Sequence, residues 1–217
     1  MNKETPSELQ ENKFVDFLFE ELVKSNVKPE IFTSEEKRAE IKQDIHQLLV
    51  KFDHDISLGA TLLHEKALPE EQDAIDRVLT DFVDSQREHS NQEFLEDGKK
   101  LVTIASRELG EGHFQDAEAM FCFILHLFPM LGSAWSGLAA SAYALGKQEQ
   151  ADLLFSLGVN TLPKNYFLLL QAAYFYLSSG QQEKIPEVLD KIYYVLSFEQ
   201  DPACIAYVSD EIKKFHL

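Results

Sequence analysis

The side chains that could carry chemistry in this sequence are seven histidines and two cysteines. Asp53, His54 and Asp55 place three potential metal ligands in a row. Neighbouring residues on a helix do not face one another, however. A solvated charged cluster is therefore a better interpretation than a metal site. His113 is expected in a turn between helices and His126 on a helix, where surface exposure or satisfied partial burial is the simpler interpretation.

The two cysteines, Cys122 and Cys204, also favour a structural interpretation. Cys122 lies in the apolar run 120–124, which predicts a buried small hydrophobic residue, and no basic neighbour in sequence would lower its thiol pKa. Two cysteines are too few for a disulfide framework, so we expect a reducing compartment. The sequence has no phosphate-binding glycine loop, no Gly-x-Ser-x-Gly and no Cys-x-x-Cys. We therefore predict no enzymatic activity, no metal site and no cofactor.

The charge of the chain restricts its partners. Lys and Arg number 20 against 37 Asp and Glu, a formal net charge of −17. Such a surface repels phosphate backbones and anionic lipids, so nucleic acid and membrane insertion are not expected. The first residues lack the apolar stretch of a signal peptide, and no window approaches 18 apolar residues. These features predict a cytosolic protein with a basic or weakly charged protein partner.

The elements that must position any functional side chain are helices throughout. Residues 1–12 are polar and predicted to be disordered, and 13–91 form an N-terminal helical region. Thr33 and Glu36 make a capping-box pattern that predicts a helix start. Polar residues 87–91 predict a boundary between the two halves. The apolar face expected for the first helix, over 13–25, consists of Phe14, Phe17, Leu18, Leu22 and Val23.

The second half contains a repeat. Gly112, Gly146 and Gly180 follow one another at intervals of 34 residues, the period of tetratricopeptide repeats. When the sequence is aligned in a 34-residue frame counted from Gly98, similar residues recur at four further positions. A proline also closes two of the three units. The matching residues are Leu101, Trp135 and Leu169; Ala105, Ala139 and Ala173; Ala117, Ala151 and Ile185; Phe121, Phe155 and Leu189; and the prolines Pro129 and Pro163, with Ser197 in the third unit.

These residues resemble the tetratricopeptide motif, in which small residues let two antiparallel helices approach and large ones fill the space between pairs. We predict an all-α solenoid in residues 92–217, with units at about 98–131, 132–165 and 166–199. Residues 202–217 are predicted to form a capping helix, because a stacked array needs a terminal cap.

In repeats of this type the first helices line a concave groove. The resemblance implies which positions line this groove. In this sequence those positions hold mostly apolar residues and one basic side chain, which suits an extended apolar or proline-bearing peptide. An alternative is that an N-terminal helix folds back into the groove. The candidates are Lys99, Val102, Ser106, Leu109, Ser133, Ser136, Ala140, Tyr143, Phe167, Leu170, Tyr174 and Leu177.

A closer resemblance lies in the segments 112–117, 136–146, 155–158 and 170–173. They are similar to the class II chaperones of bacterial type III secretion, the SycD/LcrH family. The resemblance implies a non-catalytic virulence chaperone of the bacterial cytoplasm that keeps hydrophobic translocator proteins soluble by binding an extended N-terminal segment in the groove. Residues 1–90 are longer than this family's usual N-terminal region, which leaves open a homodimer and a second partner.

A second hypothesis is a non-catalytic adaptor or regulator of the secretion apparatus. It would bind a folded partner through residues 13–90 or through the convex face. Loss of the partner on deletion of residues 1–90 would distinguish it from the chaperone.

Overall fold

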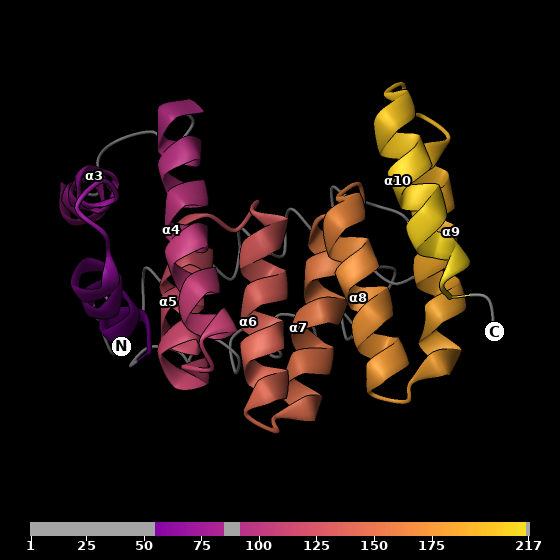
Figure 1. Ribbon diagram of the computed structural model, residues 1–217, viewed down its shortest axis with the longest axis horizontal. Coiled ribbons are helices and arrows are strands. Elements are labelled where there is room, and N and C mark those ends of the chain that lie inside the picture. Colours follow the sequence, from indigo (N-terminus) through magenta and orange to yellow (C-terminus); the bar gives the residue numbers. More distant parts are fainter. Residues whose placement is uncertain (1–54, 85–91, 216–217) are drawn as a thin grey trace, which may run out of the picture.

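The computed structural model describes residues 55–84 and 92–215, and this part of the chain is helical with short connections (Figure 1). The predictions for residues 1–54 and for the boundary at 87–91 lie outside it. The helices are 55–66, α3 (Gln72–Asp84), α4 (Gln92–Gly110), α5 (Phe114–Leu127), α6 (Gly132–Ala144), α7 (Gln148–Thr161), α8 (Tyr166–Ser178), the 3₁₀ turn η2 (Gln182–Lys184), α9 (Ile185–Leu196) and α10 (Pro202–Lys213).

Consecutive helices pack in pairs, and the pairs stack along the chain. α4 packs on α5, α6 on α7 and α8 on α9, while α5 contacts α6 and α7 contacts α8. The first helices of the pairs also contact one another, from α4 to α6 and from α6 to α8, and α10 follows against α8. The predicted all-α helical repeat with a C-terminal helix is confirmed.

Each pair turns at one of the periodic glycines. Gly112, Gly146 and Gly180 have φ of +86°, +78° and +78°, in the left-handed region where a Cβ is unfavourable. The amide of the residue after each glycine donates to a carbonyl in the last turn of the first helix. The 34-residue glycine period therefore marks three turns of the same conformation.

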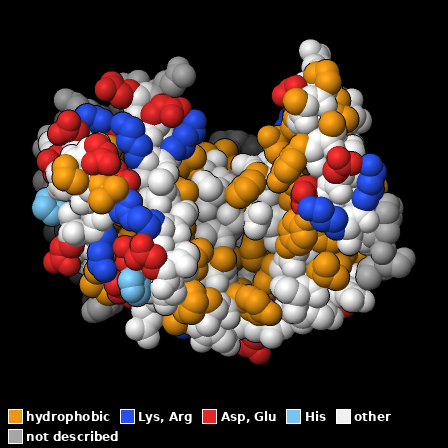
Figure 2. All heavy atoms as spheres, viewed as in Figure 1, with side chains coloured by type: hydrophobic (Ala, Val, Ile, Leu, Met, Phe, Trp, Pro, Cys, Tyr) orange, Lys and Arg blue, Asp and Glu red, His pale blue; other side chains and the backbone are white. Residues whose placement is uncertain are grey.

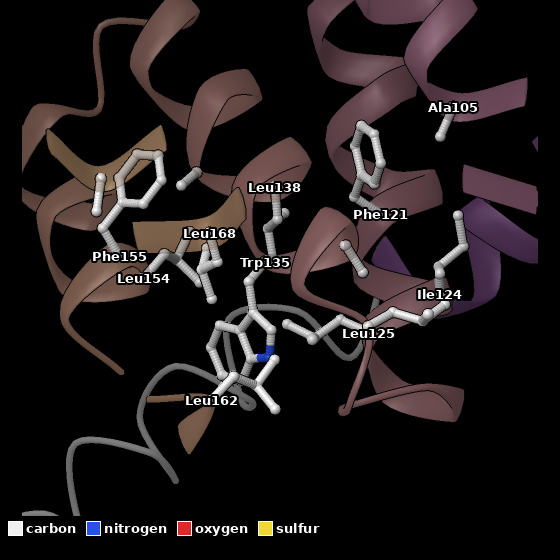
Figure 3. Packing of buried hydrophobic residues seen from close by; sticks show 14 of the residues in the cluster. Ala105, Phe121, Ile124, Leu125, Trp135, Leu138, Leu154, Phe155, Leu162 and Leu168 are labelled. Atoms are coloured by element: carbon white, nitrogen blue, oxygen red, sulfur yellow. The ribbon is translucent and has the colours of Figure 1, made fainter. Parts of the chain in front are cut away.

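The small positions of the frame let the helices approach closely. Ala105, Ala139 and Ala173 are buried, as are Ala117 and Ala151. The next layer is filled by large side chains, and Figure 3 shows Leu125 and Leu162 pointing toward the ring of Trp135. This interdigitation joins one pair to the next, since no pair could bury its apolar face alone.

One close approach within this core requires a glycine. A Cβ on Gly137 would overlap the ring of Phe121, which is fully buried. α6 therefore lies against α5 at a distance that only a missing side chain allows.

The N-terminal pair attaches to the first repeat from two sides. A Cβ on Gly59 would overlap the backbone carbonyl of Ala119, so helix 55–66 lies directly against α5. α3 packs on α4, where the guanidinium of Arg77 makes two hydrogen bonds, of 2.8 and 2.7 Å, to the buried carboxylate of Asp97. This pair covers the end of the array at α4 and α5 (Figure 1).

The first repeat helix is longer than the frame predicts. α4 begins at Gln92, six residues before Gly98. Phe94 in this extension packs its ring on Phe128 at 4.5 Å between centroids, and Gly98 leaves room for the same ring. A contact with the end of α5 thus stabilises six extra residues of helix that the 34-residue pattern does not contain.

Candidate functional site

The surface dips over α6 and α8 between raised ends formed by α4 and α10, and we call this dip the hollow (Figures 1 and 2). Figure 2 shows hydrophobic side chains on its floor and on the wall toward α10, while charged side chains of both signs gather on the wall toward α4. The first helices of the pairs, α4, α6 and α8, lie side by side in one row. Residues on the shared face of this row can therefore contact the same ligand.

Tyr143, near the end of α6, is 37% exposed. Its ring meets that of Phe175 edge-on at 5.3 Å between centroids. Its hydroxyl donates a long hydrogen bond, 3.4 Å, to the carbonyl oxygen of Ser178. These contacts fix the ring between α6 and α8 while leaving part of it free to contact another molecule.

Phe167, near the start of α8, is 43% exposed. The helix begins there because the side chain of Asn165 accepts a hydrogen bond from the amide of Leu168, at 3.0 Å. Leu177, ten residues further along α8, is half-buried against the core. α8 therefore offers apolar surface at both of its ends.

The middle of α8 is covered by α10. Tyr174 packs its ring on Phe215 at 4.7 Å, and its hydroxyl donates to the carboxylate of Glu211. Burial and this carboxylate raise the pKa of Tyr174, whereas hydrogen bonds from Lys214 and Tyr174 lower the pKa of Glu211. Tyr174 is thus largely engaged by the chain's own last helix.

Two predicted groove residues lie inside the protein. Leu170 is only 2% exposed and belongs to the hydrophobic core, because α8 is packed against both α6 and α10. Ser136 is also buried, and its hydroxyl donates to the carbonyl of Ser133 at 3.2 Å. These two positions support the neighbouring helices and do not offer side chains to a ligand.

The first repeat contributes a mixed surface. Lys99 and Ser106 are exposed, while Val102 and Leu109 are half-buried against the core. Ala140 in the second repeat is half-buried. The ammonium of Lys99 lies 2.7 Å from the carboxylate of Glu96. Lys99 is the only basic residue among the predicted groove positions, so these positions hold no basic cluster for a terminal carboxylate.

None of the described N-terminal residues lies in the hollow. Helix 55–66 packs on α5 and α3 on α4, away from the floor at α6 and α8. The alternative that an N-terminal helix folds back into the groove stays open only for residues 1–54, which lie outside the described part.

A charged cluster that the sequence did not reveal joins the N-terminal pair to the first turn. The buried carboxylate of Glu108 lies 3.2 Å from Nζ of Lys66 and 2.9 Å from Nδ1 of His113. Burial alone would raise the pKa of Glu108, but the hydrogen bonds from His113 and Lys66 outweigh it and lower that pKa. Glu108, Glu111 and His113 together place three possible metal-ligand atoms close to one another. The carboxylate of Glu108, however, is already paired with Lys66 and His113.

The two cysteines are free. Cys122 is buried on α5, as predicted, and burial raises the pKa of its thiol well above the ordinary value. A buried thiol whose pKa is raised is a poor nucleophile at neutral pH.

No protein-family model, curated protein or solved structure matches this chain. Within residues 55–84 and 92–215, no helix has both the length and the apolar character needed to cross a bilayer. The family resemblance therefore stays a prediction from the residues.

Proposed function

We propose that this chain is a cytoplasmic chaperone of the type III secretion translocator class, built on tetratricopeptide-type repeats. It holds an extended apolar segment of a translocator protein in the hollow and keeps that protein soluble. The observation that carries the proposal is the pair of exposed aromatic rings, Tyr143 and Phe167, on helices whose other large apolar residues are packed.

The energetics favour a short anchor motif. Each fully buried Leu or Phe side chain contributes roughly 1.5–3 kcal/mol before the cost of ordering the peptide. Two or three anchors in contact with Tyr143, Phe167 and the half-buried Leu177 would give a segment moderate affinity that permits later release. The net charge of −17 would also attract a basic client.

The direct test is co-expression with a hydrophobic translocator, measuring its soluble fraction and its co-purification. Phe167→Glu should abolish both, because it places a charge in the apolar contact. Leu68→Glu is the matched control, since Leu68 is 44% exposed against 43% for Phe167 and lies in the connection before α3. Equal retention of the translocator by both variants would remove the hollow from the mechanism.

A further inference from the structure

The end of α9 exposes three aromatic side chains, which we call the aromatic patch: Tyr193, Tyr194 and Phe198. They are 52%, 56% and 70% exposed. The rings of Tyr194 and Phe198 meet edge-on at 5.2 Å between centroids, so at least these two form one surface. Aromatic rings at such exposure are typical of contact surfaces, where they bury much area at small entropic cost.

The repeat frame shows why this surface stands open. Leu125 in α5, Val159 in α7 and Tyr193 in α9 are separated by 34 residues and occupy the same position of their helices. Leu125 and Val159 are buried, and Figure 3 shows Leu125 pointing toward Trp135 on the following helix. The following helix covers this position in the first pair, whereas Tyr193 in the third pair is uncovered.

The last helix does not supply the missing cover. α10 packs on α8, and Phe215, two residues after the end of α10, contacts Tyr174. Val208 and Ile212 face inward with it, while Tyr207 on α10 is 55% exposed. The end of α9 therefore keeps the shape of a surface on which another helix stacks.

The charges around the patch indicate the chemistry of that helix. Residues 182–207 contain five acidic and two basic side chains. Glu187 and Asp190 lie on α9 within two turns before the aromatic rings, and Glu199 and Asp201 follow them. Of the two lysines, the buried Lys191 lies 3.4 Å from the carboxylate of Glu187, and Lys184 pairs with Asp152 outside the patch, so acidic side chains still outnumber basic ones. The rim is therefore acidic, which opposes a second copy of this acidic chain and favours a basic partner that can also stack cations on the rings.

We infer that the aromatic patch is a second docking site, distinct from the hollow, for an amphipathic helix of a partner protein. This helix carries a large apolar residue against Tyr193 and lysines or arginines toward the acidic rim. The partner helix would cover Tyr193 in the way that α6 covers Leu125. The partner helix thus extends the array by one element without occupying the hollow.

The test uses the full chain and a synthetic helix as probe. The probe copies α6, which presents Trp135 to Leu125, with lysines in place of Ser133, Ala140 and Ala144. A second peptide carries glutamates at the same three positions. Fluorescence anisotropy should show that the lysine peptide binds at least tenfold more tightly than the glutamate peptide. The double variant Tyr193→Ser/Tyr194→Ser should lose at least tenfold in affinity, and Phe167→Ser should stay within twofold.

Three outcomes would overturn the inference. The first is that the lysine peptide does not bind, and the second is that the patch variant binds it as tightly as the unaltered chain. Alternatively, sedimentation velocity could show a dimer that Tyr194→Ser converts to a monomer, in which case a second copy occupies the patch. Phe167→Ser alters the hollow and not the aromatic patch, so it distinguishes binding at the two sites. Either proposal can therefore fail without the other.

Discussion

The indole Nε1 of Trp135 donates a hydrogen bond of 2.8 Å to the carbonyl oxygen of Pro129. The two residues belong to successive units of the 34-residue frame: Pro129 closes the first, and Trp135 is the large residue at the fourth position of the second. Trp135 is buried, so the bond satisfies a donor that water cannot reach. One side chain thus fills the space between two helix pairs and fixes the connection that joins them.

Substitution of Trp135 should destabilise the array in two distinguishable steps. Trp135→Phe keeps most of the packing but removes the donor to Pro129, and should lower the free energy of unfolding by about 1–3 kcal/mol. Trp135→Ala also leaves a cavity and should cost about 3–5 kcal/mol. Because Trp135 is the single tryptophan, unfolding should be followed by circular dichroism. Equal stability of the Phe and Ala variants would contradict the packing role.

The turn glycines should respond to substitution differently from a glycine inside a helix. Gly146 has a φ of +78° and open space around it, so Gly146→Ala should cost about 1–2 kcal/mol from backbone strain alone. Gly110 also has open space but ends α4 without positive φ, so Gly110→Ala should be neutral or slightly stabilising. Urea denaturation of both variants measures the difference, and similar losses would show that φ is not the cause.

The ion pair between Arg77 and the buried Asp97 should make stability depend on pH. The hydrogen bonds from Arg77 hold the pKa of Asp97 below its ordinary value, outweighing the effect of burial. A lowered carboxyl pKa stabilises the fold above the pKa of the unfolded chain, about 3.9, and this contribution is lost as pH falls through the folded-state pKa. Asp97→Asn should cost about 1.5–3 kcal/mol at pH 7, toward the lower end because Arg77 stays half exposed.

The pH dependence supplies the control for this pair. The difference in unfolding free energy between the unaltered chain and Asp97→Asn should shrink as pH is lowered below 4, as measured by chemical denaturation at each pH. Asp210→Asn, which removes an exposed pair with Lys213, should leave the profile unchanged. A difference that stays constant down to pH 3 would mean that the carboxylate charge does not stabilise the fold.

The two thiols should differ in reactivity. Cys122 is buried with a raised pKa, whereas Cys204 is half-buried near the start of α10. Titration of the native protein with a thiol reagent at pH 8 should show one fast and one slow equivalent. Cys204→Ser should remove the fast one. A fast equivalent that survives in this variant would place Cys122 at the surface.

Much of the fold follows from the sequence because each repeat makes the same local demands. The glycine turns, the small residues at Ala105, Ala139 and Ala173 and the large ones at Trp135 and Phe155 are found where the frame places them. The six extra residues of α4 were not predicted, because they depend on Phe94 meeting Phe128, a contact between residues 34 positions apart at the ends of different helices.

The candidate site was predicted less completely. Spacing assigns Tyr143, Leu170 and Tyr174 to one face, but it does not reveal what covers that face. Leu170 is buried by the packing of α8 between its neighbours, and Tyr174 meets Glu211 of α10 and Phe215 just after the end of that helix. Both outcomes depend on where the last helix docks, which a repeat pattern ending before it cannot specify. Tyr193 is exposed for the same reason, because the last helix docks on α8 and leaves Tyr193 uncovered.

The central claim is that the hollow holds an extended apolar segment, and site-specific photo-cross-linking tests it most directly. A benzophenone amino acid in place of Phe167 in the full chain should cross-link a peptide from the translocator's N-terminal region, and excess unlabelled peptide should abolish the product. The same photoprobe in place of Leu68 should give none. Cross-linking from position 68 but not from 167 would contradict the account.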